Sequence, residues 1–144
     1  MKMSKTVGKL MLNLAKAQSE FPEFKDDSFG YEKRYSYLSL NGITKIVVPI
    51  LGKNNVALVQ EHRMNVTDGL PFVLINTRLF CEDEWIENTL SFPLGDPVKG
   101  TSEIMQCGSV ASYLRRYSLL AMLGIAGGDP DIESLNEIEN NKKG

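Results

Sequence analysis

The sequence predicts an α+β domain with two N-terminal helices, an antiparallel three-stranded β-meander, and a long C-terminal helix packed with the sheet. Two observations favour this class. Apolar residues recur with helical spacing in three segments, and between the second and third of them lie three stretches rich in Val, Ile, Thr and aromatic residues. Turn-forming pairs separate these stretches, which is typical of strands joined by tight hairpins.

The first helix is expected at residues 6–19, and Phe21-Pro22 should end it. Residues 23–30 resemble a polar loop, and residues 31–37 a short extended segment. A second helix follows, with Ser39 or Asn41 as its candidate cap and a kink or tightening expected at Pro49. The predicted buried positions are Val7, Leu10, Met11, Leu14 and Ala17 in the first helix and Ile43, Ile46, Val47, Ile50 and Leu51 in the second.

Three strands are expected at residues 56–63, 71–81 and 84–94, with turns at 68–69 and 82–83. Along the second strand both alternating sets of side chains include apolar residues. We therefore expect each face of the sheet to be at least partly covered, one of them by the long helix at residues 102–123.

The long helix has two different faces. Its apolar arc is predicted to contain Ile104, Cys107, Val110, Ala111, Leu114, Tyr117, Ala121 and Met122, and the opposite face Gln106, Ser109, Ser112, Tyr113 and Arg116. The second set suits a phosphodiester backbone held by Arg116 and Ser109, with Tyr113 free to stack, and it equally suits a buried polar network. Arg115 projects about 100° away from Arg116, toward the apolar arc.

The composition is that of one globular domain. The chain has 144 residues, 42% hydrophobic and 24% charged, and its apolar runs are too short to span a bilayer, so a cytoplasmic location is expected. Cys81 and Cys107 are isolated and His62 is the only histidine, so no zinc site and no disulfide framework are expected.

The net charge of −2 is unusual for a protein that binds nucleic acid. However, five of the 18 acidic residues and two of the 16 basic ones follow residue 128, so residues 1–128 carry 13 acidic and 14 basic side chains. A basic groove in this nearly neutral body would require the convergence of Lys33, Arg34, Lys45, Lys53, Arg115 and Arg116.

Catalysis has little support in the sequence. The acids at 26–27 and 82–84 are expected in solvated turns, and Gly127-Gly128 is expected to stop a helix rather than bind phosphate, since no lysine follows it. We therefore expect no enzyme activity, no metal and no cofactor.

Two segments resemble the ERF (essential recombination function) family of phage single-strand annealing proteins. The first, KRYSYLSLNGITKIVVPILGKNNVALVQ at 33–60, matches a Lys- and Tyr-containing segment that leads into a helix. The second, QCGSVASYLRRYSLLAMLGIAGGDPD at 106–131, is similar to the family run Gln-x-x-Gly-Ser-x-x-Thr-Tyr-x-x-Arg-Tyr-x-Leu, with one residue fewer between Gln106 and Gly108. Ser112 replaces the usual threonine, and Pro130 interrupts the acidic residues that follow.

The resemblance implies a protein that binds single-stranded DNA and anneals complementary strands without ATP, as a homo-oligomeric ring or helical filament. It implies a β-β-β-α annealing core at residues 1–131, followed by an acidic tail at 132–144. Together with the helix face, it predicts DNA contacts by Lys33, Arg34, Tyr35, Tyr37, Gln106, Ser109, Ser112, Tyr113, Arg115 and Arg116.

The sequence leaves other functions open. The two adjacent arginines could be a solvated pair or form salt bridges between subunits, and Tyr35 and Tyr37 could belong to the core. The main alternative to annealing is a passive single-strand-binding or protein-interaction module with the same fold. A nuclease is disfavoured because few carboxylates are placed to converge on metal ions.

Overall fold

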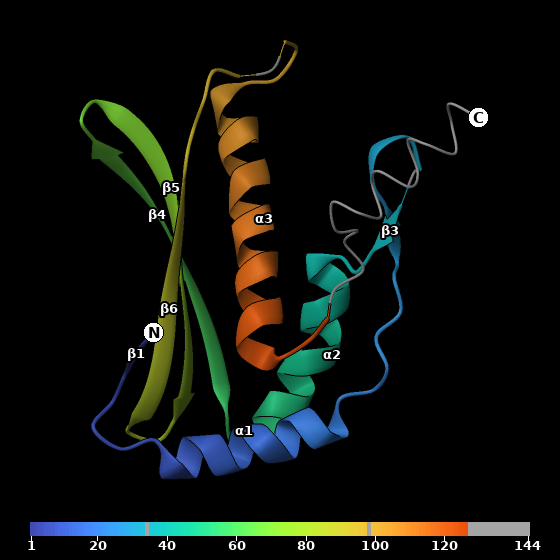
Figure 1. Cartoon of the computed structure of the whole chain (residues 1–144), viewed down its shortest axis with the longest axis vertical. Helices are drawn as coiled ribbons and strands as arrows, with labels where there is room; N and C mark the ends of the chain where they lie inside the picture. Colours follow the sequence, from blue (N-terminus) through green and yellow to red (C-terminus); the bar gives the residue numbers. More distant parts are fainter. Residues whose placement is uncertain (34, 98, 127–144) are drawn as a thin grey trace.

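A computed structural model describes all residues of the chain except 34, 98 and 127–144. The described part contains three α-helices, a four-stranded sheet and a two-stranded ribbon (Figure 1). In chain order the elements are β1 (Lys2–Met3), α1 (Gly8–Glu20), β2 (Ser28–Phe29), the 3-10 turn η1 (Tyr31–Lys33), β3 (Ser36–Tyr37), α2 (Leu40–Lys53), β4 (Ala57–Thr67), β5 (Leu70–Cys81), β6 (Glu84–Pro93) and α3 (Glu103–Leu123). The α+β class is confirmed.

The two N-terminal helices have the faces that the sequence predicts. α1 ends immediately before Phe21-Pro22, and α2 begins after Ser39, whose Oγ accepts a hydrogen bond from the Gly42 N–H at 3.0 Å. Pro49 lies inside α2, which continues beyond it. The buried side chains are Leu10, Leu14 and Ala17 in α1 and Ile43, Val47 and Leu51 in α2.

The sheet is antiparallel, with the strand order β1-β6-β5-β4. β4, β5 and β6 follow one another through the two-residue turns that the sequence signals. In the first turn Asp68 and Gly69 both have positive φ, 53° and 78°, as a tight hairpin requires. Strand β1 was not predicted. Its two residues pair with Glu87 and Ile86 of β6, and two residues are too few to show an alternating pattern.

The helices all lie on one face of the sheet, and α3 runs along β5 and β6 (Figure 1). On β5 the side chains of this inner face are Val73, Ile75, Thr77 and Leu79, all fully buried. The opposite set on β5 includes Leu74 and is only half-buried, and no described element covers it. We expected both faces of the sheet to be at least partly covered, but the described helices cover only one of them.

The predicted apolar arc of α3 is partly wrong. Cys107, Val110, Ala111 and Leu114 do pack on the sheet, but Ile104 is 81% exposed, and Tyr117 and Ala121 are also exposed. The C-terminal half of α3 is packed on two sides, against the sheet on one and against α1 and α2 on the other. The residues buried there are Arg116, Ser118, Leu119, Leu120 and Leu123.

The segment between α1 and α2 forms a small ribbon rather than one extended stretch. β2 and β3 pair antiparallel, with Ser28 opposite Tyr37, and the turn η1 lies between them. α3 ends at Leu123, because Gly124 after it adopts the left-handed conformation with φ 69° and stops the helix. The predicted stop at Gly127-Gly128 and the acidic tail at 132–144 lie outside the described residues.

Candidate nucleic-acid interface

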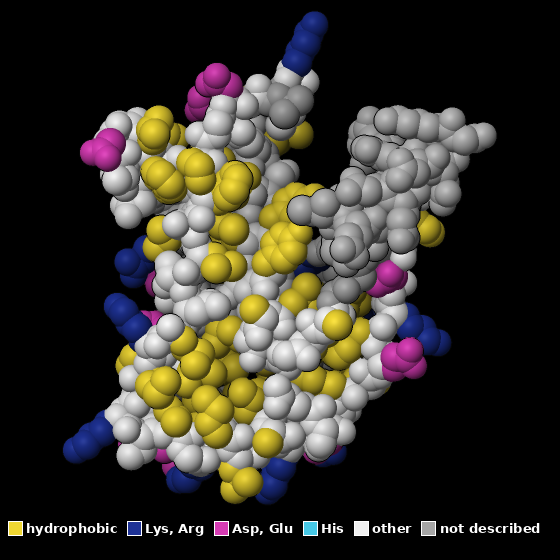
Figure 2. Space-filling model, viewed as in Figure 1, with side chains coloured by type: hydrophobic (Ala, Val, Ile, Leu, Met, Phe, Trp, Pro, Cys, Tyr) yellow, Lys and Arg dark blue, Asp and Glu magenta, His cyan; other side chains and the backbone are white. Residues whose placement is uncertain are grey.

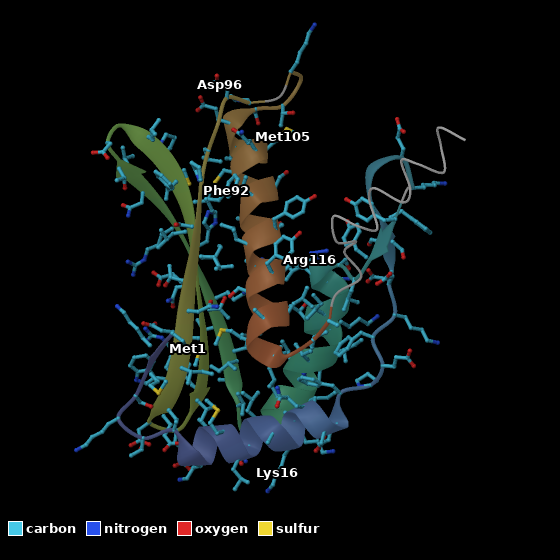
Figure 3. The ribbon with its side chains drawn as sticks, viewed as in Figure 1. Met1, Lys16, Phe92, Asp96, Met105 and Arg116 are labelled. Atoms are coloured by element: carbon cyan, nitrogen blue, oxygen red, sulfur yellow. The ribbon has the colours of Figure 1, made fainter. Side chains whose placement is uncertain are left out.

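A hollow of about 590 Å³ lies between one face of α3 and the start of α2. Figure 3 shows Arg116 in this place, between the two helices. The lining combines tyrosines, serines, apolar side chains and this arginine: Tyr37, Leu40, Met105, Gly108, Ser109, Ser112, Tyr113 and Arg116. The hollow therefore brings together five of the residues that the sequence predicts to contact DNA.

Asp27 fixes the segment that leads into α2. One oxygen of its carboxylate accepts a hydrogen bond from the Ser39 N–H and the other from Ser39 Oγ, each at 2.8 Å. Partial burial raises the pKa of Asp27, but these hydrogen bonds outweigh it, so the pKa lies below its ordinary value. Asp26 likewise accepts from Ser36 Oγ at 2.6 Å. Both acids are exposed outside the helices and strands, as the sequence predicts, and they also hold the ribbon in place.

Arg116 forms the base of the hollow and is only 4% exposed. Its Nε donates a hydrogen bond to the Leu38 carbonyl at 2.9 Å, and its guanidinium carbon lies 4.9 Å from the centre of the Tyr37 ring and 5.1 Å from that of Tyr117. The sequence placed Arg116 on the polar face of α3, which suited either a DNA contact or a buried polar network. The side chain is buried because residues 37–39 and the start of α2 cover that side of the helix.

Tyr113 and Tyr117 form an exposed aromatic pair on α3. Their ring centres are 6.3 Å apart with an angle of 17° between the planes, and the residues are 57% and 45% exposed. Ser109 and Ser112 are exposed beside them. Sequence reasoning missed Tyr117 by counting it as core, although residues four apart on a helix are neighbours and the pair could have been found from that spacing.

Arg115 faces the sheet. Its Nε donates to Gln60 Oε1 at 3.0 Å, and Gln60 Nε2 donates back to the Arg115 carbonyl at 3.0 Å. One turn further along α3, Ser118 Oγ lies 2.7 Å from Thr77 Oγ1 and 2.8 Å from Asn88 Oδ1. A polar network thus lies on the sheet side of α3, but it is not formed by the helix face for which the sequence left a buried network open. On that face only Arg116 is buried.

The other predicted contact residues lie around the hollow or away from it. Lys33 is exposed in η1, and the half-buried Tyr35 ring lies 6.3 Å from that of Tyr37. Gln106 Nε2 donates to the Asp96 carbonyl at 3.3 Å, outside the hollow. Arg34 lies outside the described residues.

The cations do not form one basic groove in the described part of the chain. Lys53 pairs with Glu20 at 3.2 Å at the far end of α2, and Arg115 points to the sheet. Lys45 is exposed on α2. In the view of Figure 2, Lys and Arg side chains lie mainly along the outline of the molecule, whereas hydrophobic side chains lie along α3. The hollow is therefore aromatic and hydroxyl-rich rather than strongly cationic.

Two further findings bear on the chemistry. Among the residues that the structure describes, no group of three or more His, Cys, Asp or Glu side chains is placed to hold a metal ion. No helix of the described part is long and apolar enough to cross a membrane. The hollow itself offers hydroxyls and ring faces, which are groups suited to hydrogen bonding and stacking.

Comparison with known proteins identifies the family. The sequence model of the ERF superfamily matches residues 10–144, nearly the whole chain. The chain belongs to the ERF superfamily. No curated protein and no solved structure matches it significantly. Membership supports a phage recombination function of the annealing type and implies binding of single-stranded DNA, and the resemblance seen in the sequence is confirmed.

Proposed function

We propose that this ERF protein binds single-stranded DNA in the hollow between α3 and α2 and promotes annealing of complementary strands without nucleotide hydrolysis or covalent chemistry. We further propose that it does so in the host cytoplasm as a homo-oligomeric ring or filament. The observation that carries the proposal is the exposed Tyr113–Tyr117 pair beside two serine hydroxyls, in a chain that belongs to this family.

Stacking is the main interaction that the hollow offers. Every base has an aromatic face, so stacking on tyrosine binds single strands without sequence preference and contributes about 1–3 kcal/mol per base. A duplex has no unstacked bases to offer. An exposed tyrosine pair therefore favours single strands over duplex, as an annealing protein requires before pairing begins.

Phosphate contacts would come from exposed polar groups around the tyrosines. Ser109 and Ser112 can donate hydrogen bonds to phosphate oxygens. Lys33 of η1 and Lys45 of α2 are exposed and can add positive charge. We propose that Arg116 acts through Tyr37 and Tyr117, because a guanidinium that is 4% exposed has little surface left for a phosphate.

Annealing would follow from how the strand is held. Stacking on one side and phosphate contacts along the backbone would keep a strand extended with part of each base free to pair. This lowers the entropic cost of forming the first base pairs with a second strand. The resulting duplex would bind the tyrosines less well and would leave the hollow.

The experiment mixes a dye-labelled strand with its complement, without nucleotide, and follows duplex formation with and without protein. We expect the wild-type protein to accelerate annealing, Tyr113→Ala to lose most of the acceleration, and Leu12→Ala to retain it, since Leu12 is exposed on the distant helix α1. Tight binding of the labelled strand without acceleration would instead favour the passive module, and absence of binding would contradict the proposal.

A further inference from the structure

The sheet has a long open edge at β4. Among the described residues, β4 pairs only with β5, and its other side faces no strand. β4 is 11 residues long, and residues 61–70, at the end of the β4–β5 hairpin, are all exposed. In Figure 1 this hairpin projects away from the helices. An open edge of this length presents unpaired N–H and C=O groups that readily pair with another strand.

The sequence of β4 is self-complementary in an antiparallel pairing. If two copies meet about a two-fold axis at His62, the central residue of β4, Ala57 lies opposite Thr67 of the other copy and the whole strand is paired. In this register Glu61 of each copy lies opposite Arg63 of the other. Both side chains are exposed and point to the face of the sheet that no described helix covers.

Charge selects this register over its neighbours. A shift that centres the axis on Arg63 places the two arginines opposite each other, and a shift that centres it on Glu61 does the same for the two glutamates. Like charges directly opposite in a sheet are destabilising, whereas opposite charges stabilise the pair. In the single chain Arg63 Nε donates to Glu61 Oε1 at 2.6 Å, so the two charges already lie on the same face of β4. On dimerisation each would exchange this partner for the one in the second copy.

The other face of the pairing has Gln60 and His62 near its centre and apolar residues at its two ends. Val66 is 69% exposed and would lie opposite Leu58 of the second copy. Leu58 lines a hollow of about 920 Å³ that extends to Val48 of α2, which is itself 47% exposed. The second copy would therefore cover apolar surface at both ends of the strand while it pairs the open edge.

We propose that two copies of this chain pair through β4 in an antiparallel, two-fold symmetric arrangement centred on His62, and that this dimer is the unit from which the larger assembly is built. The part that concerns the larger assembly rests on the proposed function. The dimer itself rests on the edge, the charges and the exposed apolar residues. A two-fold contact of this kind uses the same surface on both subunits and closes at two.

Charge reversal tests the register directly. Glu61→Arg gives a strand with two arginines and Arg63→Glu gives one with two glutamates, so each variant repels its own copy. We expect either variant to weaken dimerisation at least about ten-fold, measured by sedimentation equilibrium without DNA. The double variant Glu61→Arg/Arg63→Glu should recover the dimer, and an equimolar mixture of the two single variants should form a mixed dimer. Lys16→Glu, on the exposed surface of α1, is the matched control and should dimerise normally.

Three results would overturn the proposal: a monomeric wild-type protein, unchanged association of both single variants, or failure of the double variant to recover while its unfolding curve is that of a folded protein. Because no DNA is present, each of these results leaves the single-strand-binding proposal standing. Conversely, normal dimerisation of a protein that does not anneal would contradict the proposed function alone.

Discussion

The Nε of Arg116 donates to the carbonyl oxygen of Leu38 at 2.9 Å, and this bond joins the last helix to the segment that precedes α2. It also places the guanidinium against Tyr37 and Tyr117. The arginine that the sequence suggests as a direct DNA ligand is thus positioned to shape the site. Its substitution should therefore affect the fold as well as binding.

Arg116→Lys should lower the free energy of unfolding by about 1–3 kcal/mol, although the positive charge is retained. An ammonium group cannot reproduce the planar donor set, so the buried Leu38 carbonyl loses its partner. Urea unfolding followed by circular dichroism measures the change. Lys16→Arg, at an exposed position on α1, is the control and should shift the value by less than about 0.5 kcal/mol. Equal effects of the two substitutions would show that the Arg116 bond contributes little.

Tyr113→Ala should reduce the affinity for a labelled oligothymidine by about 1–3 kcal/mol, because one stacking surface is lost. Tyr113→Phe keeps the ring and should bind nearly as well as the wild type. Fluorescence anisotropy measures both affinities. Since Tyr113 is 57% exposed, we expect neither variant to lose much stability. A loss of affinity in Tyr113→Phe as large as in Tyr113→Ala would mean that the hydroxyl, and not stacking, makes the contact.

Replacing each of two glycines of α2 by alanine should change the stability of the protein in opposite directions. A Cβ at Gly52 meets nothing within 4 Å, so Gly52→Ala should stabilise the protein by about 0.5–1 kcal/mol through helix propensity. A Cβ at Gly42 would lie 2.2 Å from Asp27 Oδ2, an oxygen already bonded to Ser39. Gly42→Ala should therefore destabilise by about 1 kcal/mol, since Asp27 must leave that bond. Thermal unfolding of the two variants side by side decides the matter, and stabilisation by both would contradict the role given to Asp27.

Glu84 should make stability depend on acid pH. The Leu10 N–H donates to Glu84 Oε1 at 2.7 Å, and this hydrogen bond, with smaller ones from Thr6 and Lys9, lowers the pKa of Glu84 below its ordinary value of 4.5. A carboxyl with a lowered folded-state pKa stabilises the fold above that ordinary value, and the contribution is lost as the pH falls. Glu84→Gln should be less stable than the wild type at pH 7, with a difference that shrinks below about pH 4.5. Urea unfolding at pH 7 and pH 3.5 measures this, and a constant difference would show that the charge is not what matters.

The sequence predicted most helices and strands because each has a repeated apolar pattern and a clear boundary. The boundaries are set by nearby residues in the sequence, and such local signals can be read from a single chain. Examples are the helix end before Pro22, the helix cap Ser39 and the turn at Asp68-Gly69. β1 was missed because its two residues gain their structure only from pairing with β6. Glu84 was taken for a turn residue because its bond to Leu10 spans 74 positions, which no local pattern reveals.

The site was predicted in part for the same reason. The helical spacing of Ser109, Ser112 and Tyr113 places them on one face whatever surrounds the helix. The burial of Arg116 and the exposure of Tyr117 depend instead on where α2 and residues 37–39 pack against α3. Such packing between distant segments is decided by tertiary contacts and not by the periodicity of one helix.

The location of the bound strand is the central claim, and photo-crosslinking tests it most directly. Single-stranded DNA containing 5-iododeoxyuridine would be bound, irradiated, and the modified peptides identified by mass spectrometry. We predict adducts on Tyr113 or Tyr117 of α3, with loss of crosslinking when duplex DNA is used. Adducts confined to the opposite face of the sheet, where Trp85 lies, would contradict the account and place the DNA elsewhere.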